Sequence, residues 1–100
     1  MSVNPDQFEV LRKLSKKPNA NQRRLARELG FSLGKINYCL NALKDKGLIK
    51  IKNFEKNPNK LNYIYILTPK GITEKSNLTI NFMKRKMKEY DELKSELEEN

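Results

Sequence analysis

The sequence predicts a mainly helical protein with one small β-hairpin, followed by a long C-terminal helix. Apolar residues recur at helical spacing up to Leu43, alternate with lysines after Gly47, and return to an uninterrupted helical pattern after Pro69. A chain of 100 residues holds one domain, or one domain with an appendage. We therefore expect one domain over residues 1–68 and a separate helical segment over residues 69–100.

The first expected helix begins at Asn4-Pro5. Asparagine is a common N-cap, proline suits the first helical position, and Gln7 is placed to complete a capping-box-like pair. Pro18 ends this helix because proline cannot continue the backbone hydrogen bonding.

Two further helices follow, with a tight turn between them. Asn21 is the expected N-cap of a helix that ends at Gly30, and Ser32 is the expected N-cap of a helix that closes at Gly47. The apolar stripe that this third helix buries is Ile36, Leu40 and Leu43.

A two-stranded hairpin is expected after Gly47. Ile49 and Ile51 alternate with lysines, which is typical of a half-buried strand. Residues 55–60 have the composition of a polar, basic turn, and residues 61–67 are rich in strand-forming side chains.

The last expected helix begins at Thr68-Pro69 and meets no further proline or glycine after its first turn. It would run for about 30 residues, or roughly 45 Å. Ile72 is expected to pack on the hairpin, while a later apolar stripe would project into water. Because such exposure is costly, we expect this helix to form a coiled coil with a second copy. Antiparallel pairing would bring the basic run 84–88 of one copy against the acidic end of the other. The alternative is a helix that folds back on its own domain. The expected dimerisation residues are Ile80, Met83, Met87, Tyr90, Leu93 and Leu97.

The charge distribution favours a polyanion as partner of the first segment. The chain has a formal charge of +9; residues 1–70 hold 15 basic and 5 acidic side chains, whereas residues 71–100 hold 6 and 7. Many lysines can also simply solvate a small protein, so the motifs have to decide.

Several classes of protein are disfavoured by composition. The chain has no histidine and one cysteine, Cys39, which removes His-based triads, a disulfide framework and a Cys-rich zinc site. We therefore expect neither an enzyme nor a bound metal or cofactor. The longest apolar run, Tyr63 to Leu67, is too short to span a membrane, and no signal-peptide pattern opens the chain. We therefore expect a cytoplasmic protein.

Three helices followed by a basic hairpin predict a winged helix-turn-helix. Its third helix would enter the major groove of double-stranded DNA. The outward face of this helix is polar and nearly uncharged, and its asparagine, lysine and tyrosine side chains suit base edges. The alternative interpretation is that this face is an ordinary solvent-facing side of a helix. The candidate base-reading residues are Ser32, Gly34, Lys35, Asn37, Tyr38 and Asn41. The candidate backbone and wing contacts are Asn21, Arg23, Arg24, Lys56, Asn57, Asn59 and Lys60.

Four segments resemble the bacterial MarR-family regulators: residues 21–30, 37–43, 46–49 and, most tellingly, Leu67-Thr68-Pro69-Lys70-Gly71. Residues 33–40 and the short length resemble a small subgroup associated with exopolysaccharide (EPS) gene clusters. The resemblance implies a homodimeric transcription factor on a palindromic operator, with recognition helices in the major groove and wings at the minor groove. Dimer symmetry predicts half-sites about one helical turn apart.

The chain departs from that family in two ways. Asparagine and lysine replace the usual Asp-Arg signature of the wing, and the long N-terminal dimerisation segment is missing, so dimerisation would rest on the C-terminal helix. Whether a small-molecule effector binds stays open. Two alternative functions also stay open: a protein–protein interaction module, and an effector- or redox-responsive switch that acts through Cys39.

Overall fold

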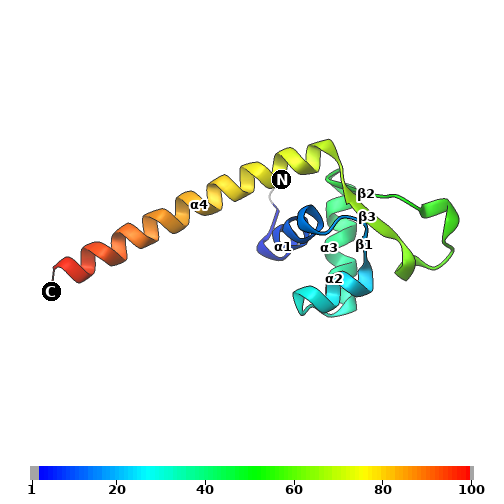
Figure 1. The fold of residues 1–100 in the computed structure, drawn as a ribbon, viewed down its shortest axis with the longest axis horizontal. Helices are drawn as coiled ribbons and strands as arrows, with labels where there is room; N and C mark the ends of the chain where they lie inside the picture. Colours follow the sequence, from blue (N-terminus) through cyan, green and yellow to red (C-terminus); the bar gives the residue numbers. More distant parts are fainter. Residues whose placement is uncertain (1–2, 100) are drawn as a thin grey trace.

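In the computed structural model, which describes residues 3–99, one long helix projects from a body of three helices and a small sheet (Figure 1). The molecule measures 62 × 26 × 22 Å along its principal axes. The helices are α1 (Pro5–Lys16), α2 (Gln22–Leu29), α3 (Leu33–Asp45) and α4 (Pro69–Glu98). The strands are β1 (Ala20–Asn21), β2 (Ile49–Ile51) and β3 (Ile64–Leu67), and short 3₁₀ helices occupy Phe54–Lys56 and Lys60–Asn62.

The helices begin where the sequence predicts, and each has a side-chain N-cap. Asn4 Oδ1 accepts from the Gln7 backbone amide at 2.8 Å, and the Asn4 amide donates to Gln7 Oε1 at 3.3 Å, which completes the capping box. The side chains of Asn21, Ser32 and Thr68 each accept from one backbone amide in the first turn of α2, α3 and α4. These caps satisfy amide groups that the first turn of a helix leaves without partners.

The sheet has three antiparallel strands, in the order β1-β3-β2, so the prediction of a two-stranded hairpin was incomplete. Ala20 lies opposite Tyr65 and Ile49 opposite Leu67. Sequence patterns do not reveal β1 because a two-residue strand has no alternation to detect. The returning strand begins at Ile64 instead of Leu61, because the preceding residues form a 3₁₀ turn.

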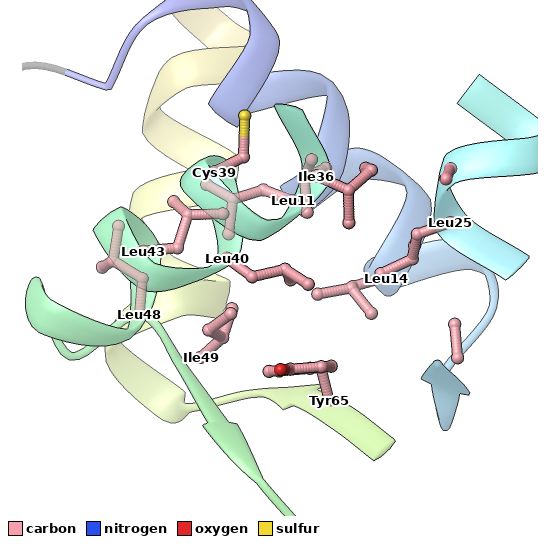
Figure 2. Close-up of a cluster of buried hydrophobic side chains, with 13 residues drawn as sticks. Leu11, Leu14, Leu25, Ile36, Cys39, Leu40, Leu43, Leu48, Ile49 and Tyr65 are labelled. Carbon is pink, nitrogen blue, oxygen red and sulfur yellow. The ribbon is translucent and has the colours of Figure 1, made fainter. Parts of the chain in front are cut away.

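The core lies between α1, α2, α3 and the sheet (Figure 2). Ile36, Leu40 and Leu43 of α3 are fully buried, as their helical spacing predicts. They point toward leucines of α1 and α2 and toward the ring of Tyr65 in β3 (Figure 2). Burial raises the pKa of the Tyr65 hydroxyl. The same packing holds α3 rigidly while its opposite side stays at the surface.

The first half of α4 packs on the body, and the second half extends beyond it (Figure 1). Gly71 is buried against Leu48, whereas Ile72 is 55% exposed. The prediction that Ile72 packs on the hairpin was therefore wrong: the small residue makes the contact and the bulky neighbour turns outward. Farther along, the Phe82 ring lies 6.1 Å from the Phe8 ring of α1, centroid to centroid. Every helix within residues 3–99 is too short or too polar to span a bilayer.

Candidate nucleic-acid interface

The turn between α2 and α3 is held by two local features. Gly30 adopts a left-handed conformation with φ of 70°, and the Phe31 amide donates to the Ala26 carbonyl at 2.9 Å. The buried side chain of Gln22 donates from Nε2 to the Leu33 carbonyl at 3.3 Å. Gln22 therefore joins the start of α2 to the start of α3, a positioning contact that sequence reasoning missed because it depends on tertiary packing.

The outward side of α3 exposes most of the predicted base-reading residues. Tyr38 is 66% exposed, and Ser32, Gly34 and Lys35 are also at the surface. The Ser32 hydroxyl accepts from the Lys35 amide at 3.1 Å, so it is occupied as a helix cap. A Cβ built on Gly34 would meet no atom within 4 Å, which leaves the backbone of the first turn of α3 open to a ligand.

Asn37 and Asn41 are less accessible than the sequence suggests. Both are half-buried. The Asn37 Oδ1 atom is enclosed and has no hydrogen-bond partner among the described residues. Helical spacing places Asn37 on a flank of the polar face, but only the tertiary structure shows how far its neighbours cover it.

Lys35 is drawn toward α1. Its ammonium lies 3.2 Å from an Asp6 carboxylate oxygen and 4.1 Å from the centroid of the Phe31 ring. Asp6 is within reach because α1 packs against α3, and Phe31 lies in the turn directly before the N-cap of α3. One of the three donors of the Lys35 ammonium is thus engaged by Asp6.

The predicted backbone contacts on α2 differ in their surroundings. Arg23 is exposed, whereas Arg24 pairs with Glu28, Nε to Oε2 at 3.3 Å. Lys17 of the α1–β1 connection also pairs with Glu28, at 3.2 Å. The hydrogen bond from Lys17, together with nearby positive charge, holds the pKa of Glu28 below its usual value. Asn21 uses its side-chain oxygen to accept from the Arg24 amide, so it acts as a cap.

The wing is a folded element instead of an open turn. Asn53 closes its base: Oδ1 accepts from the Ile64 amide at 2.7 Å, and Nδ2 donates to the Asn62 carbonyl at 3.3 Å. The Phe54 and Tyr63 rings pack at 5.5 Å between centroids. Sequence reasoning missed this use of Asn53, and its position two residues after the end of β2 is the signal that could have found it.

The predicted wing contacts follow this architecture. Lys56 and Lys60 each end or begin a 3₁₀ turn and are exposed. Asn59 is exposed too, but its Oδ1 accepts from the Leu61 amide at 2.9 Å. Asn57 is half-buried. The two lysines thus remain the side chains of this set best placed for phosphate contacts.

Comparisons with known proteins agree with this geometry. Residues 7–50 match a family of winged helix-turn-helix DNA-binding domains. A solved MarR family transcription regulator, SP03579, is 26% identical with a TM-score of 0.73, over 84% of this chain and 54% of its own. The transcriptional repressor CouR, solved with a 23-mer DNA duplex, is 30% identical with a TM-score of 0.66, over 76% of this chain and 52% of its own.

The chain contains a winged helix-turn-helix, and its fold is that of MarR-family regulators. Staphylococcus aureus MarR, solved with salicylate and kanamycin, has the same fold at 21% identity, with a TM-score of 0.71 over 85% of this chain and 57% of its own. The chain thus spans a little over half the length of these solved structures. A comparison with curated proteins finds no match.

The apolar stripe runs along α4 from Ile80 to Leu97, and most of it lies on the half that projects beyond the body. All six of its residues are between 50% and 77% exposed in the single chain. They are Ile80, Met83, Met87, Tyr90, Leu93 and Leu97.

Cys39 is buried in the core, with 1% of its surface exposed. Burial, with a smaller effect of the Asp6 charge, raises the pKa of its thiol. Redox sensors have accessible, low-pKa thiols, so this environment does not favour a switch at Cys39.

Proposed function

We propose that the protein is a transcriptional regulator that binds double-stranded DNA in a sequence-specific manner as a homodimer. The observation that carries the proposal is the exposed, polar side of α3, held rigidly by a buried apolar face within a winged helix-turn-helix. The repressor CouR, whose fold is similar, is solved with a DNA duplex. A rigid helix with an accessible polar side is what reading of base edges in the major groove requires.

The base-reading role rests chiefly on the first two turns of α3. Gly34 lets the helix backbone approach the groove, and Tyr38 offers a ring and a hydroxyl beside it. Asn37, Asn41 and Lys35 complete the face, with the amide of Asn41 suited to adenine and the ammonium of Lys35 suited to guanine. The free amides of the first turn, near Ser32, suit a phosphate.

Positive charge on both sides of α3 would fix the protein on the phosphate backbone. Arg23 and Arg24 lie on α2, and Lys56 and Lys60 lie on the wing. Contacts to phosphates position a protein on the duplex without reading its sequence. We therefore assign affinity to these side chains and specificity to α3.

Homodimerisation would occur through the exposed stripe of α4. Six large apolar or aromatic side chains on one helix are costly to leave in water. A dimer with two-fold symmetry would bind a palindromic operator. The resemblance to the exopolysaccharide-associated subgroup makes promoters of such genes the first place to search for that operator.

The experiment is selection from a random duplex library with the purified protein at near-physiological salt, followed by sequencing. A two-fold-symmetric enriched site is the expected result. Binding without any enriched sequence would contradict specific recognition. An absence of binding would contradict the proposal and favour the protein–protein interaction module, for which the exposed stripe of α4 is the supporting observation.

Tyr38→Ala provides the matched test of site assignment, because Tyr38 is exposed and lies outside the core. We expect it to lose preference for the selected site while binding to random DNA is largely kept. Equal loss on both DNAs would contradict the assignment of α3 as the reading helix.

A further inference from the structure

The second half of α4 has opposite charge at its two ends. Residues 84–88 contain four basic side chains, whereas residues 89–99 contain six acidic side chains and one lysine. Two copies paired in the same direction would place like charges together along the whole length. Two copies paired in opposite directions would place the basic part of each beside the acidic part of the other.

The apolar stripe of α4 faces away from the body of its own chain. Phe82 contacts Phe8 of α1, and Leu78, on the same side of α4, packs against the core. At about 100° per residue, Met83 and Met87 lie more than a quarter turn around the helix from Phe82. Pairing through the stripe therefore leaves the contact between α4 and α1 intact.

The spacing of the stripe is the same read in either direction. When Lys94 is taken in place of its neighbour Leu93, the positions are 80, 83, 87, 90, 94 and 97, and the intervals alternate between three and four residues symmetrically about the boundary between Lys88 and Glu89. Such alternation is the a and d pattern of a coiled coil. An antiparallel pair centred on this boundary would align every layer of the stripe without a gap.

We propose that α4 pairs with α4 of a second copy in an antiparallel coiled coil centred between Lys88 and Glu89. This inference rests on the proposed homodimer and adds its direction and register. Ile80 faces Leu97 of the partner subunit, and Met87 faces Tyr90 of the partner subunit. Met83 faces Lys94 of the partner subunit, where the lysine stem packs on the thioether and its ammonium reaches water.

The residues beside the stripe support this register. Lys84 and Asp91 directly follow positions 83 and 90 of the stripe, so both lie on the same edge of α4. In this register Lys84 and Asp91 of the partner subunit are about 3 Å apart along the axis of the paired helices. Symmetry repeats the pair, so each dimer has two. On the other edge, the Lys86 stem covers Leu93 of the partner subunit. In a parallel pair Lys94 would instead stack on Lys94 of the partner subunit in the apolar layer.

The register also sets the distance between the two DNA-binding bodies. The two copies of Pro69 would lie about 58 Å apart along the paired helices, from 39 residues at about 1.5 Å each. Equivalent major-groove faces recur every 34–36 Å or so. A separation of this size fits half-sites two helical turns apart better than the one-turn spacing that the sequence predicts.

Site-specific cross-linking tests the register in a Cys39→Ser background, which removes the native thiol. Ile80→Cys and Leu97→Cys chains, one of them enlarged by a tag, are oxidised separately and as a mixture. We expect a disulfide only between the two different chains. Cross-linking of the Ile80→Cys chain to itself would overturn the antiparallel register, because those positions would then be adjacent.

A charge swap provides a second test that does not alter the apolar layers. Lys84→Asp should weaken dimerisation about tenfold or more, because two attractive pairs per dimer become repulsive. Adding Asp91→Lys in the same chain should restore the dimer. Residues 84 and 91 lie two turns apart on their own helix, so rescue requires pairing between chains. Failure of the double variant to recover would overturn the register.

Sedimentation and the selected operator separate the two proposals. A monomer at micromolar concentration would overturn the homodimer and the register together. A dimer that cross-links Ile80→Cys to itself, or that selects half-sites one turn apart, would overturn only the register. Binding to selected DNA is measured independently of both.

Discussion

Gly71, in the first turn of α4, lies directly against the backbone carbonyl of Leu48. The same carbonyl accepts from the Thr68 amide at 3.0 Å, and the Thr68 hydroxyl donates to the Gly47 carbonyl at 2.6 Å. Lys70 adds a hydrogen bond to the Lys46 carbonyl at 3.0 Å. The start of α4 is thus fixed on the residues that directly follow α3, so the proposed recognition helix and the proposed dimerisation helix are joined at one junction.

Gly71→Ala tests this junction. A Cβ there would overlap the Leu48 carbonyl and neighbouring backbone atoms, which cannot rotate away as a side chain can. We expect a loss of about 1–3 kcal/mol of folding stability or more, typical of overpacking in a core. Chemical denaturation measured by circular dichroism gives the value. A variant as stable as the parent would show that α4 does not dock through Gly71.

Gly34→Ala is the matched control and also tests the interface. A Cβ at Gly34 meets nothing within 4 Å, and alanine favours helix by about 0.5–1 kcal/mol over glycine, so stability should stay or rise. If α3 lies close in the major groove, the added methyl should nevertheless weaken binding to the selected DNA site. Unchanged affinity for that site would show that the backbone of Gly34 stays clear of DNA.

Local patterns predict most of the secondary structure because they depend on neighbours in sequence. Asn4, Asn21, Ser32 and Thr68 act as N-caps where their position before an apolar run predicts it. The pairing of Ala20 with Tyr65 joins residues far apart in sequence, so no local signal precedes it. The opposite behaviour of Gly71 and Ile72 likewise depends on where Leu48 lies.

The candidate interface is less predictable than the fold. Helical angles place Tyr38 and Gly34 on the outward side of α3, and both are accessible. They cannot show that Lys35 pairs with Asp6 or that neighbours enclose Asn37 Oδ1, because those surroundings come from other elements and from packing. The wing shows the same limit, since Asn53 acts across the two strands.

Asp6→Asn tests whether the ion pair with Lys35 competes with DNA. Both side chains are more than 40% exposed, so the pair contributes little to stability, in the range of about 0–1 kcal/mol. Releasing Lys35 should strengthen binding to the selected site severalfold, provided that Lys35 contacts DNA. The double variant Asp6→Asn with Lys35→Met should lose this gain. An equal gain in both variants would assign it to the removed acidic charge alone.

Glu28→Gln tests the pairing of Lys17 and Arg24 through pH. The pKa of Glu28 is lowered from 4.5 in the folded protein, mainly by the hydrogen bond from Lys17. A lowered pKa means that the carboxylate stabilises the fold above about pH 4.5 and that this contribution is lost as the pH falls through the folded-state value. Glu28→Gln should therefore unfold at lower temperature than the parent at neutral pH. The two melting temperatures should converge in acid; a constant difference would mean that the charge of Glu28 is not responsible.

The wing lysines should supply affinity without sequence preference. Lys56 and Lys60 are exposed at the ends of the two 3₁₀ turns, and neither has a base-reading geometry imposed by the fold. Changing each lysine to alanine should weaken binding to selected and random DNA alike. The slope of log affinity against log salt concentration should also fall by about one for each phosphate that the protein no longer neutralises. Lys44→Ala is the matched control, since Lys44 is exposed near the far end of α3. If the wing variants change the preferred sequence instead, the wing reads the minor groove directly, and the division between affinity at the wing and specificity at α3 is wrong.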